Sequence, residues 1–212
     1  MVDRLALSRR GAMAGAGMMA LLAGTRLSAA RSGAIQSDAG AKPPAPGDPG
    51  FIGVMPDLTA YLAGARTAVV PAAIRERARL HILDTLAAII ACHPLEASQL
   101  GRKYAQAMSG GGGSPIFASR ATASPIDAVF ANAMTAHAAE INDFIPSAYV
   151  QPGPSIVSAG MELARAHGRS GHELVNAIVA GYELAGRIPK AIGTRNLWLA
   201  GLANHGVGPV FG

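Results

Sequence analysis

Residues 71–93, PAAIRERARLHILDTLAAIIACH, limit the possible folds more than any other part of the chain. Large apolar residues recur along this segment at the spacing of one helix face, and Pro71 stands where a first-turn proline is tolerated. A cluster of charges at residues 75–79 lies in the first half, whereas the second half is almost wholly apolar. A helix that is apolar all round must be covered by other elements on every side. The segment therefore predicts the core helix of a multi-helix fold.

Further helices are predicted on both sides of this one, so the expected fold class is all-α. Ser124 followed by Pro125 combines an N-cap residue with a first-turn proline, and Ser170 and Glu173 have the spacing of a capping box. Pro189 is expected to kink or end the helix that Ser170 begins. The expected helices cover residues 58–65, 71–93, 95–109, 156–167 and 171–193, with one more beginning at Ser124, and a short strand or extended segment covers residues 114–119.

Composition and charge exclude several classes of function. Half of the residues are apolar and 15% are charged, which suits a globular core. The net charge is +5, and residues 1–30 carry four arginines against one aspartate, or +3, which leaves 5 − 3 = +2 for the rest. That excess is too small and scattered for a nucleic-acid surface. The single cysteine, Cys92, excludes an intrachain disulfide and a cysteine-rich zinc site, and we expect it to be a small buried residue.

The N-terminal residues have the pattern of an export signal. Arg9 and Arg10 precede a weakly apolar run of Gly, Ala and Met, and small residues follow at positions 28–30. Paired arginines before such a run are typical of a twin-arginine signal peptide, and the run is shorter than the roughly 20 residues of a membrane-spanning helix. We therefore predict a signal peptide at residues 1–30, a disordered linker at residues 31–55, a folded domain at residues 56–212, and a periplasmic location without a stable membrane span. An uncleaved anchor or an early start codon is the alternative.

Three stretches of the folded part together resemble the MmgE/PrpD family: LDTLAAIIA, SPIDAVFANAMTAHAAEIND and GHELVNAIVAGYELAGRIPKAIG. That family includes 2-methylcitrate dehydratase, cis-aconitate decarboxylase and an iminodisuccinate epimerase. The resemblance covers roughly residues 58–212. It implies the N-terminal helical domain of an enzyme that has a second, smaller domain, forms homodimers at full length and uses no organic cofactor. The family's catalytic lysine and later histidine have no counterpart here, so this chain is expected to be a truncated member.

The resemblance also implies a site. The family has the pattern Ala-His-x-x-Asp-Phe-Asp-Asp-Thr, then a loop histidine and later a His-Pro-Thr turn. His137 matches the first histidine, Glu140 stands at the family's catalytic-site acid, and Asp143 stands at the last acid of the pattern. Gln151 stands at the loop histidine, and His205 lies about two positions from the histidine of the later turn. We expect a helix to carry His137, Glu140 and Asp143 to its C-terminal end.

Removing water or CO₂ from a polycarboxylate requires a base beside a carboxylate, an acid for the leaving group and donors that hold the other carboxylates. We therefore predict Glu140, His137 and His205 as catalytic residues that face one concavity, and Asp143 and Gln151 as substrate-binding residues. His137 and Glu140 could instead ligate a metal with His205 or Asp143, but a polar cluster at a helix end explains them as simply, and no metal is predicted. His81 and Asp84 are expected to satisfy polar groups of the core.

Three departures from the family pattern leave the activity open. Glu in place of Asp at position 140 moves the carboxylate outward by one methylene, Phe144 removes a threonine hydroxyl, and Gln151 removes a titratable group. The first hypothesis is an exported lyase or isomerase acting on a small polycarboxylate. The second is a truncated or degenerate member without catalysis. The third is an exported helical interaction module that buries a partner against an apolar edge.

Overall fold

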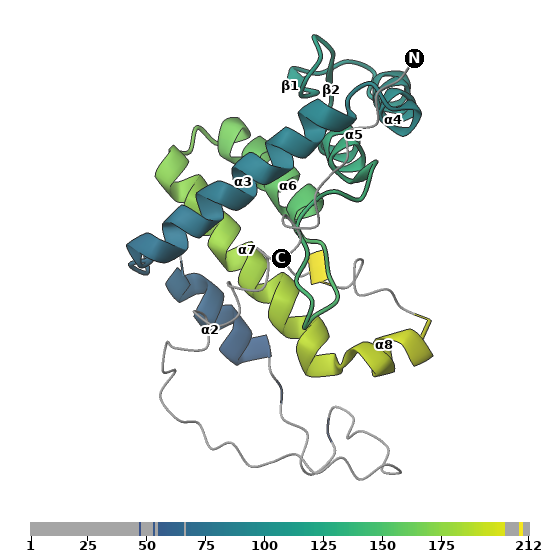
Figure 1. Ribbon diagram of the computed structural model, residues 1–212. Coiled ribbons are helices and arrows are strands. Elements are labelled where there is room, and N and C mark those ends of the chain that lie inside the picture. The colour runs from purple at the N-terminus through teal and green to yellow at the C-terminus, as the bar shows by residue number, and fades with distance from the viewer. Residues whose placement is uncertain (1–46, 48–52, 54, 66, 202–207, 210–212) are drawn as a thin grey trace. The chain divides into compact units, whose positions relative to one another are not determined.

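The computed structural model describes residues 47, 53, 55–65, 67–201 and 208–209 (Figure 1). The predicted signal peptide and the linker, apart from residues 47, 53 and 55, lie outside them. The all-α prediction is confirmed for the described residues, which form seven helices and one pair of two-residue strands. The elements are α2 (Met55–Ala65), α3 (Ala72–Cys92), α4 (Glu96–Met108), β1 (Ser114–Pro115), β2 (Thr122–Ala123), α5 (Pro125–His137), α6 (Gly153–Ala166), α7 (Gly171–Ile192) and α8 (Thr194–Leu199).

The described elements fall into two compact units. One contains α2, and the other contains α3 to α8 with both strands. In the larger unit α3 packs against α5, α6 and α7. The expectation that its apolar second half is covered on every side is wrong, because Leu83 is 60% and Ile90 is 69% exposed. Ile89 and Cys92 of that half are 1% exposed, which confirms the prediction for Cys92. No single described helix is long and apolar enough to cross a membrane, although α3 and α4, bent by 96°, pass that test of length and composition as a pair.

The helix starts follow the capping signals in the sequence. The Ser124 hydroxyl accepts a hydrogen bond from the Asp127 amide at 3.3 Å. The Ser170 hydroxyl accepts one from the Glu173 amide at 3.2 Å, and the Glu173 carboxylate accepts the Ser170 amide at 2.9 Å, so the predicted capping box is confirmed. The expectation that Pro189 could end this helix is wrong, because α7 continues past it to Ile192 and stops at Gly193, where φ is 89°.

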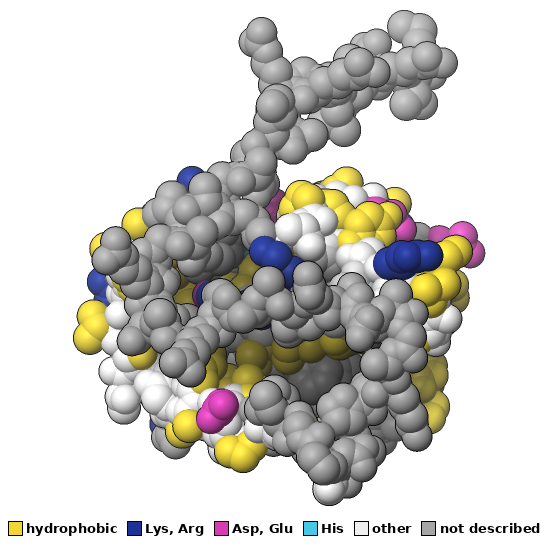
Figure 2. Space-filling view, turned by 90° about the horizontal axis from the view of Figure 1, so that it is seen from below, with side chains coloured by type: hydrophobic (Ala, Val, Ile, Leu, Met, Phe, Trp, Pro, Cys, Tyr) yellow, Lys and Arg dark blue, Asp and Glu magenta, His cyan; other side chains and the backbone are white. Residues whose placement is uncertain are grey.

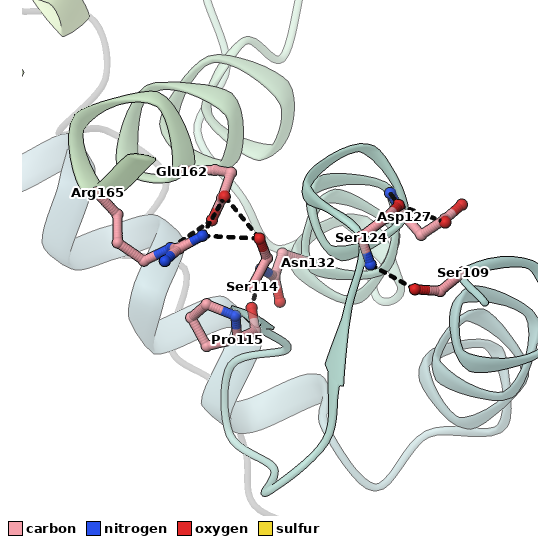
Figure 3. Close-up of polar contacts among 8 residues, drawn as sticks. All are labelled: Ser109, Ser114, Pro115, Ser124, Asp127, Asn132, Glu162 and Arg165. Atoms are coloured by element: carbon pink, nitrogen blue, oxygen red, sulfur yellow. Dashed lines mark hydrogen bonds and ion pairs between the residues drawn. The ribbon is translucent and has the colours of Figure 1, made fainter. Parts of the chain in front are cut away.

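A small polar cluster fastens the β1–β2 hairpin to α5 and α6 (Figure 3). Glu162 of α6 accepts hydrogen bonds from the Ser114 hydroxyl and from Arg165, both at 2.7 Å. The side-chain amide of Asn132 donates to the Pro115 carbonyl at 3.2 Å. The hydrogen bond from Arg165 lowers the pKa of the Glu162 carboxyl, and the Ser114 hydroxyl lowers it further. Because all members of the cluster have partners, we assign it a structural role.

Charged side chains are sparse on the face drawn in Figure 2. Among its described residues, hydrophobic and uncharged atoms predominate, and the lysines and arginines stand in separate groups.

Candidate functional site

Three of the predicted site residues, Glu140, Asp143 and Gln151, lie in the loop of residues 138–152, which joins α5 to α6. The expectation that one helix carries His137, Glu140 and Asp143 is wrong, because α5 ends at His137 and the two acids follow it in the loop. The Glu140 amide donates to the His137 carbonyl at 3.0 Å, and Glu140 has a φ of 51°. A residue in this left-handed conformation cannot continue a right-handed helix. The loop can therefore turn back toward α3 and α7.

Asp143 anchors this loop in the core. Its side chain is 7% exposed, and its carboxylate has three partners from three helices. The Tyr182 hydroxyl of α7 donates to Oδ2 at 2.7 Å, the Gly153 amide at the start of α6 donates to Oδ1 at 3.0 Å, and His81 Nδ1 of α3 lies 3.1 Å from Oδ2. A buried carboxylate is stable only when its oxygens are paired in this way. Asp143 therefore fixes the loop to α3, α6 and α7 together.

The surroundings of Asp143 are closely packed. A Cβ atom added to Gly153 would lie 2.5 Å from Asp143 Oδ1 and 2.7 Å from Thr85 Oγ1, so only glycine fits there. The rings of His81 and Tyr182 are 4.9 Å apart. Burial, and then the charge of Asp143, raise the pKa of the Tyr182 hydroxyl well above its usual range. The same two causes raise the pKa of the Asp84 carboxyl.

His137 lies at the exposed beginning of the loop. Its Nδ1 is 3.0 Å from Oδ1 of the buried Asn142, whose amide nitrogen donates to the Asp143 carbonyl at 3.3 Å. With Asn142 Oδ1 as the acceptor, Nδ1 carries the hydrogen, and Nε2 is the basic nitrogen of the neutral ring. The side chain of Asn142 therefore orients the imidazole and links it to the anchored part of the loop.

Glu140 is exposed, and its carboxylate makes no hydrogen bond or ion pair with any described residue. Gln151 is half-buried at the other end of the loop, next to Pro152 at the start of α6. Between them Ile145 and Val150 form an isolated bridge, in which the Ile145 amide donates to the Val150 carbonyl at 2.8 Å. This bridge closes residues 145–150 into a turn within the loop.

Phe144 does not fill the centre of the loop. Its ring packs edge-on against Tyr149 at 5.4 Å, and 38% of the residue is exposed. His205 lies outside the described residues. The structure thus places Glu140, Asp143 and Gln151 in one loop, directly after His137 at the end of α5. The concavity that these residues are expected to share with His205 stays a prediction. Among the described residues no three His, Cys, Asp or Glu side chains are placed to hold a metal ion.

Sequence reasoning identified part of the anchor. His81 was expected to satisfy a polar group of the core, and its contact with Asp143 confirms this. Tyr182 and Gly153 were missed as partners of Asp143. The hydrogen bond of Tyr182 gives no sequence signal, because a single buried hydroxyl on a helix has no periodicity. Gly153 could have been found from its place between two prolines at a helix start, where a free amide needs an acceptor.

The family model of the MmgE/PrpD N-terminal domain matches residues 56–212. A search of curated proteins found no match.

Proposed function

Because the N-terminal domain model matches residues 56–212, this chain belongs to the MmgE/PrpD family, and on this basis we propose that it acts as a lyase or isomerase on a small polycarboxylate. The reaction class is a dehydration, a decarboxylation or an epimerisation. Each of these makes or breaks a bond to a proton at carbon next to a carboxylate, so each requires a base and an acid.

We assign the base to Glu140. The observation that supports this assignment is the contrast between the two carboxylates of the loop. Asp143 is buried with three partners, whereas Glu140 is exposed and has no described partner. A carboxylate already held by three groups is a poor proton acceptor. A free one at the rim of the loop is available to a substrate.

The other residues support this base. His137, oriented by Asn142 through Nδ1, presents Nε2 as the second proton-transfer group, and His205 is the third catalytic residue of the proposal. Gln151 offers amide donors to a substrate carboxylate. Asp143, predicted as a substrate contact, fits better as the residue that holds the loop, because its oxygens are already engaged.

A second candidate is a non-catalytic family member that still binds an acid. Gln151 favours it, because an amide in place of the family's loop histidine keeps hydrogen bonding and loses proton transfer. Phe144 favours it as well, because an exposed aromatic ring replaces a hydroxyl.

Proton transfer can be tested without knowing the product. The whole chain is incubated in D₂O with citrate or cis-aconitate, and with propionate as the control, and proton NMR follows deuterium incorporation beside the carboxylates. We expect exchange with a tricarboxylate only. Glu140→Gln should slow this exchange at least about 100-fold, whereas Glu96→Gln, at an exposed glutamate in the first turn of α4, should leave it unchanged.

Each outcome separates the hypotheses. Thermal stabilisation by a tricarboxylate without exchange supports the non-catalytic candidate. If a tricarboxylate causes neither thermal stabilisation nor deuterium exchange, the result contradicts the proposed function. Exchange that is equally fast in the Glu140→Gln variant shows that another residue is the base.

We also propose that residues 1–30 direct export of the folded chain to the periplasm. Replacing Arg9 and Arg10 by lysine should retain the protein in the cytoplasm of a bacterium with a twin-arginine pathway. Fractionation measures this, and unchanged export of the double variant would rule out the twin-arginine route.

A further inference from the structure

Two aromatic side chains of the loop between α5 and α6 stand at its surface. Phe144 is 38% and Tyr149 is 56% exposed, and their ring centroids are 5.4 Å apart in an edge-on contact. We call these two side chains the ring pair. Sites for small molecules are lined mainly by aromatic and apolar side chains, with a few polar groups that fix the orientation of the ligand. The ring pair supplies the first part of such a site.

The register of the turn at residues 145–150 places Gln151 beside the ring pair. Ile145 and Val150 face each other across the antiparallel bridge, and Val150 is fully buried. Next to this bridge Phe144 lies opposite Gln151 in the pairing. Because successive side chains of paired extended segments alternate between two sides, Phe144 and Gln151 share the side away from Val150. The ring contact shows that Tyr149 is on that side as well.

The backbone beneath the ring pair is held in place. Asp143 directly precedes Phe144 and is fixed by its three partners on α3, α6 and α7. The Tyr149 amide donates to the Pro146 carbonyl at 3.3 Å. Tyr149 has a φ of 52°, a conformation that glycine and asparagine adopt more easily. A large ring held at such a position indicates a functional use of the ring, and a preformed surface has little ordering cost on binding.

An amide next to two rings matches an acid that carries an apolar group. The side-chain nitrogen of Gln151 can donate to a carboxylate. A compact and wholly polar acid bound there would leave the rings in contact with water. An apolar substituent on the same acid would pack against the rings and leave water itself, which is favourable for both surfaces.

We propose that the ring pair is a specificity subsite, which receives a phenyl-sized apolar substituent of the polycarboxylate that Gln151 binds. The substrate class is then a dicarboxylate or tricarboxylate with a bulky apolar side group. This inference rests on the proposed function for the binding of an acid, and it applies equally to the non-catalytic candidate.

Isothermal titration calorimetry of the whole chain with succinate, phenylsuccinate and citrate tests the subsite. Succinate and phenylsuccinate carry the same two carboxylates and differ by one phenyl group. We expect phenylsuccinate to bind at least about 10-fold more tightly than succinate. Phe144→Ala and Tyr149→Asn should each reduce this ratio below about 3-fold and change the affinity for succinate by less than about 2-fold. Asparagine is tolerated at the φ of position 149, so the second variant removes the ring without straining the turn.

A second exposed aromatic pair provides the matched control. The rings of Tyr104 and Phe130 are 5.3 Å apart on the outer side of α4 and α5, and Phe130 is 46% exposed. The inner side of the same two helices packs through fully buried alanines, namely Ala105, Ala128 and Ala131. Phe130→Ala therefore removes an exposed ring without disturbing the core, and it should keep the full preference for phenylsuccinate. Circular dichroism checks the fold of each variant.

The outcomes separate this inference from the proposed function. Equal affinities for phenylsuccinate and succinate overturn the inference alone, as does binding of citrate without binding of phenylsuccinate. A preference for phenylsuccinate that Phe144→Ala and Tyr149→Asn reduce no more than Phe130→Ala does also overturns the inference alone. A chain that binds none of the three acids overturns the inference and the proposed function together.

Discussion

Replacing Tyr182 by phenylalanine removes the hydroxyl that donates a hydrogen bond to Asp143. The variant therefore measures how much this hydrogen bond stabilises the fold. The Tyr182 hydroxyl donates to the carboxylate at 2.7 Å, and the residue is 5% exposed. A hydrogen bond to a charged acceptor stabilises a fold by about 1.5–3 kcal/mol. The ring remains in the variant and Asp143 keeps His81 and the Gly153 amide, so we expect a loss of about 2 kcal/mol in the free energy of unfolding at pH 7.

The pH dependence of the stability difference between wild type and Tyr182→Phe gives a second test. Burial and the charge of Asp143 raise the pKa of Tyr182 in the folded chain, while a tyrosine in the unfolded chain titrates near pH 10. The stabilisation is therefore fully present below about pH 10 and is lost as pH rises, by about 1.4 kcal/mol per pH unit for one proton. The phenylalanine variant has no such proton. The difference between the two proteins should shrink above about pH 10 and vanish near about pH 11.5.

Urea unfolding followed by far-ultraviolet circular dichroism, from pH 7 to pH 11.5, measures this difference. Tyr104→Phe is the control, because Tyr104 is half-exposed and should change stability by less than about 0.5 kcal/mol at every pH. A Tyr182→Phe variant as stable as wild type at pH 7 would refute the assigned hydrogen bond. A difference that stays constant up to pH 11.5 would refute the assigned titration.

Three further changes test other contacts. Gly153→Ala places a Cβ atom 2.5 Å from Asp143 Oδ1 and should lower stability by about 2 kcal/mol in a thermal melt, whereas Gly171→Ala, whose Cβ meets no atom within 4 Å, should change it little; equal effects would contradict the close packing. Glu162→Gln should cost about 1 kcal/mol at pH 7. Because the pKa of Glu162 is lowered in the folded chain, its contribution is present above about pH 4.3 and lost as pH falls below that value, so urea titrations of the two proteins should converge in acid. Ser170→Ala removes the α7 cap and should cost about 1 kcal/mol, with faster amide exchange in the first turn of α7; unchanged exchange there would count against the capping box.

The helices were predictable because their start signals are local. Pro71, Ser124 and Ser170 each act on the following turn, and the observed starts lie within one residue of them. The strand at Ser114 was expected, but its partner at Thr122 was not, because a two-residue strand has no periodicity to detect. The six residues of α8 escaped prediction for the same reason.

The candidate site was predictable only in part, because its geometry depends on contacts that are distant in sequence. The pattern around His137 located the loop, yet the end of α5 was placed too late. Ala139 favours a helix, and only the left-handed conformation of Glu140 and the burial of Asn142 show why the helix stops. The Tyr182 hydroxyl that binds Asp143 comes from a residue 39 positions later in the chain. Local propensity contains no information about such a pairing.

The alanines on the inner side of α4 and α5 restrict how this protein can diverge. Ala105, Ala128 and Ala131 are fully buried, and none of these positions can accept a bulkier residue unless a whole helix moves outward. Substitutions that change side-chain size are therefore tolerated mainly on the solvent side of the same two helices. Relatives with the same backbone could acquire different partners there without any cost to the interior.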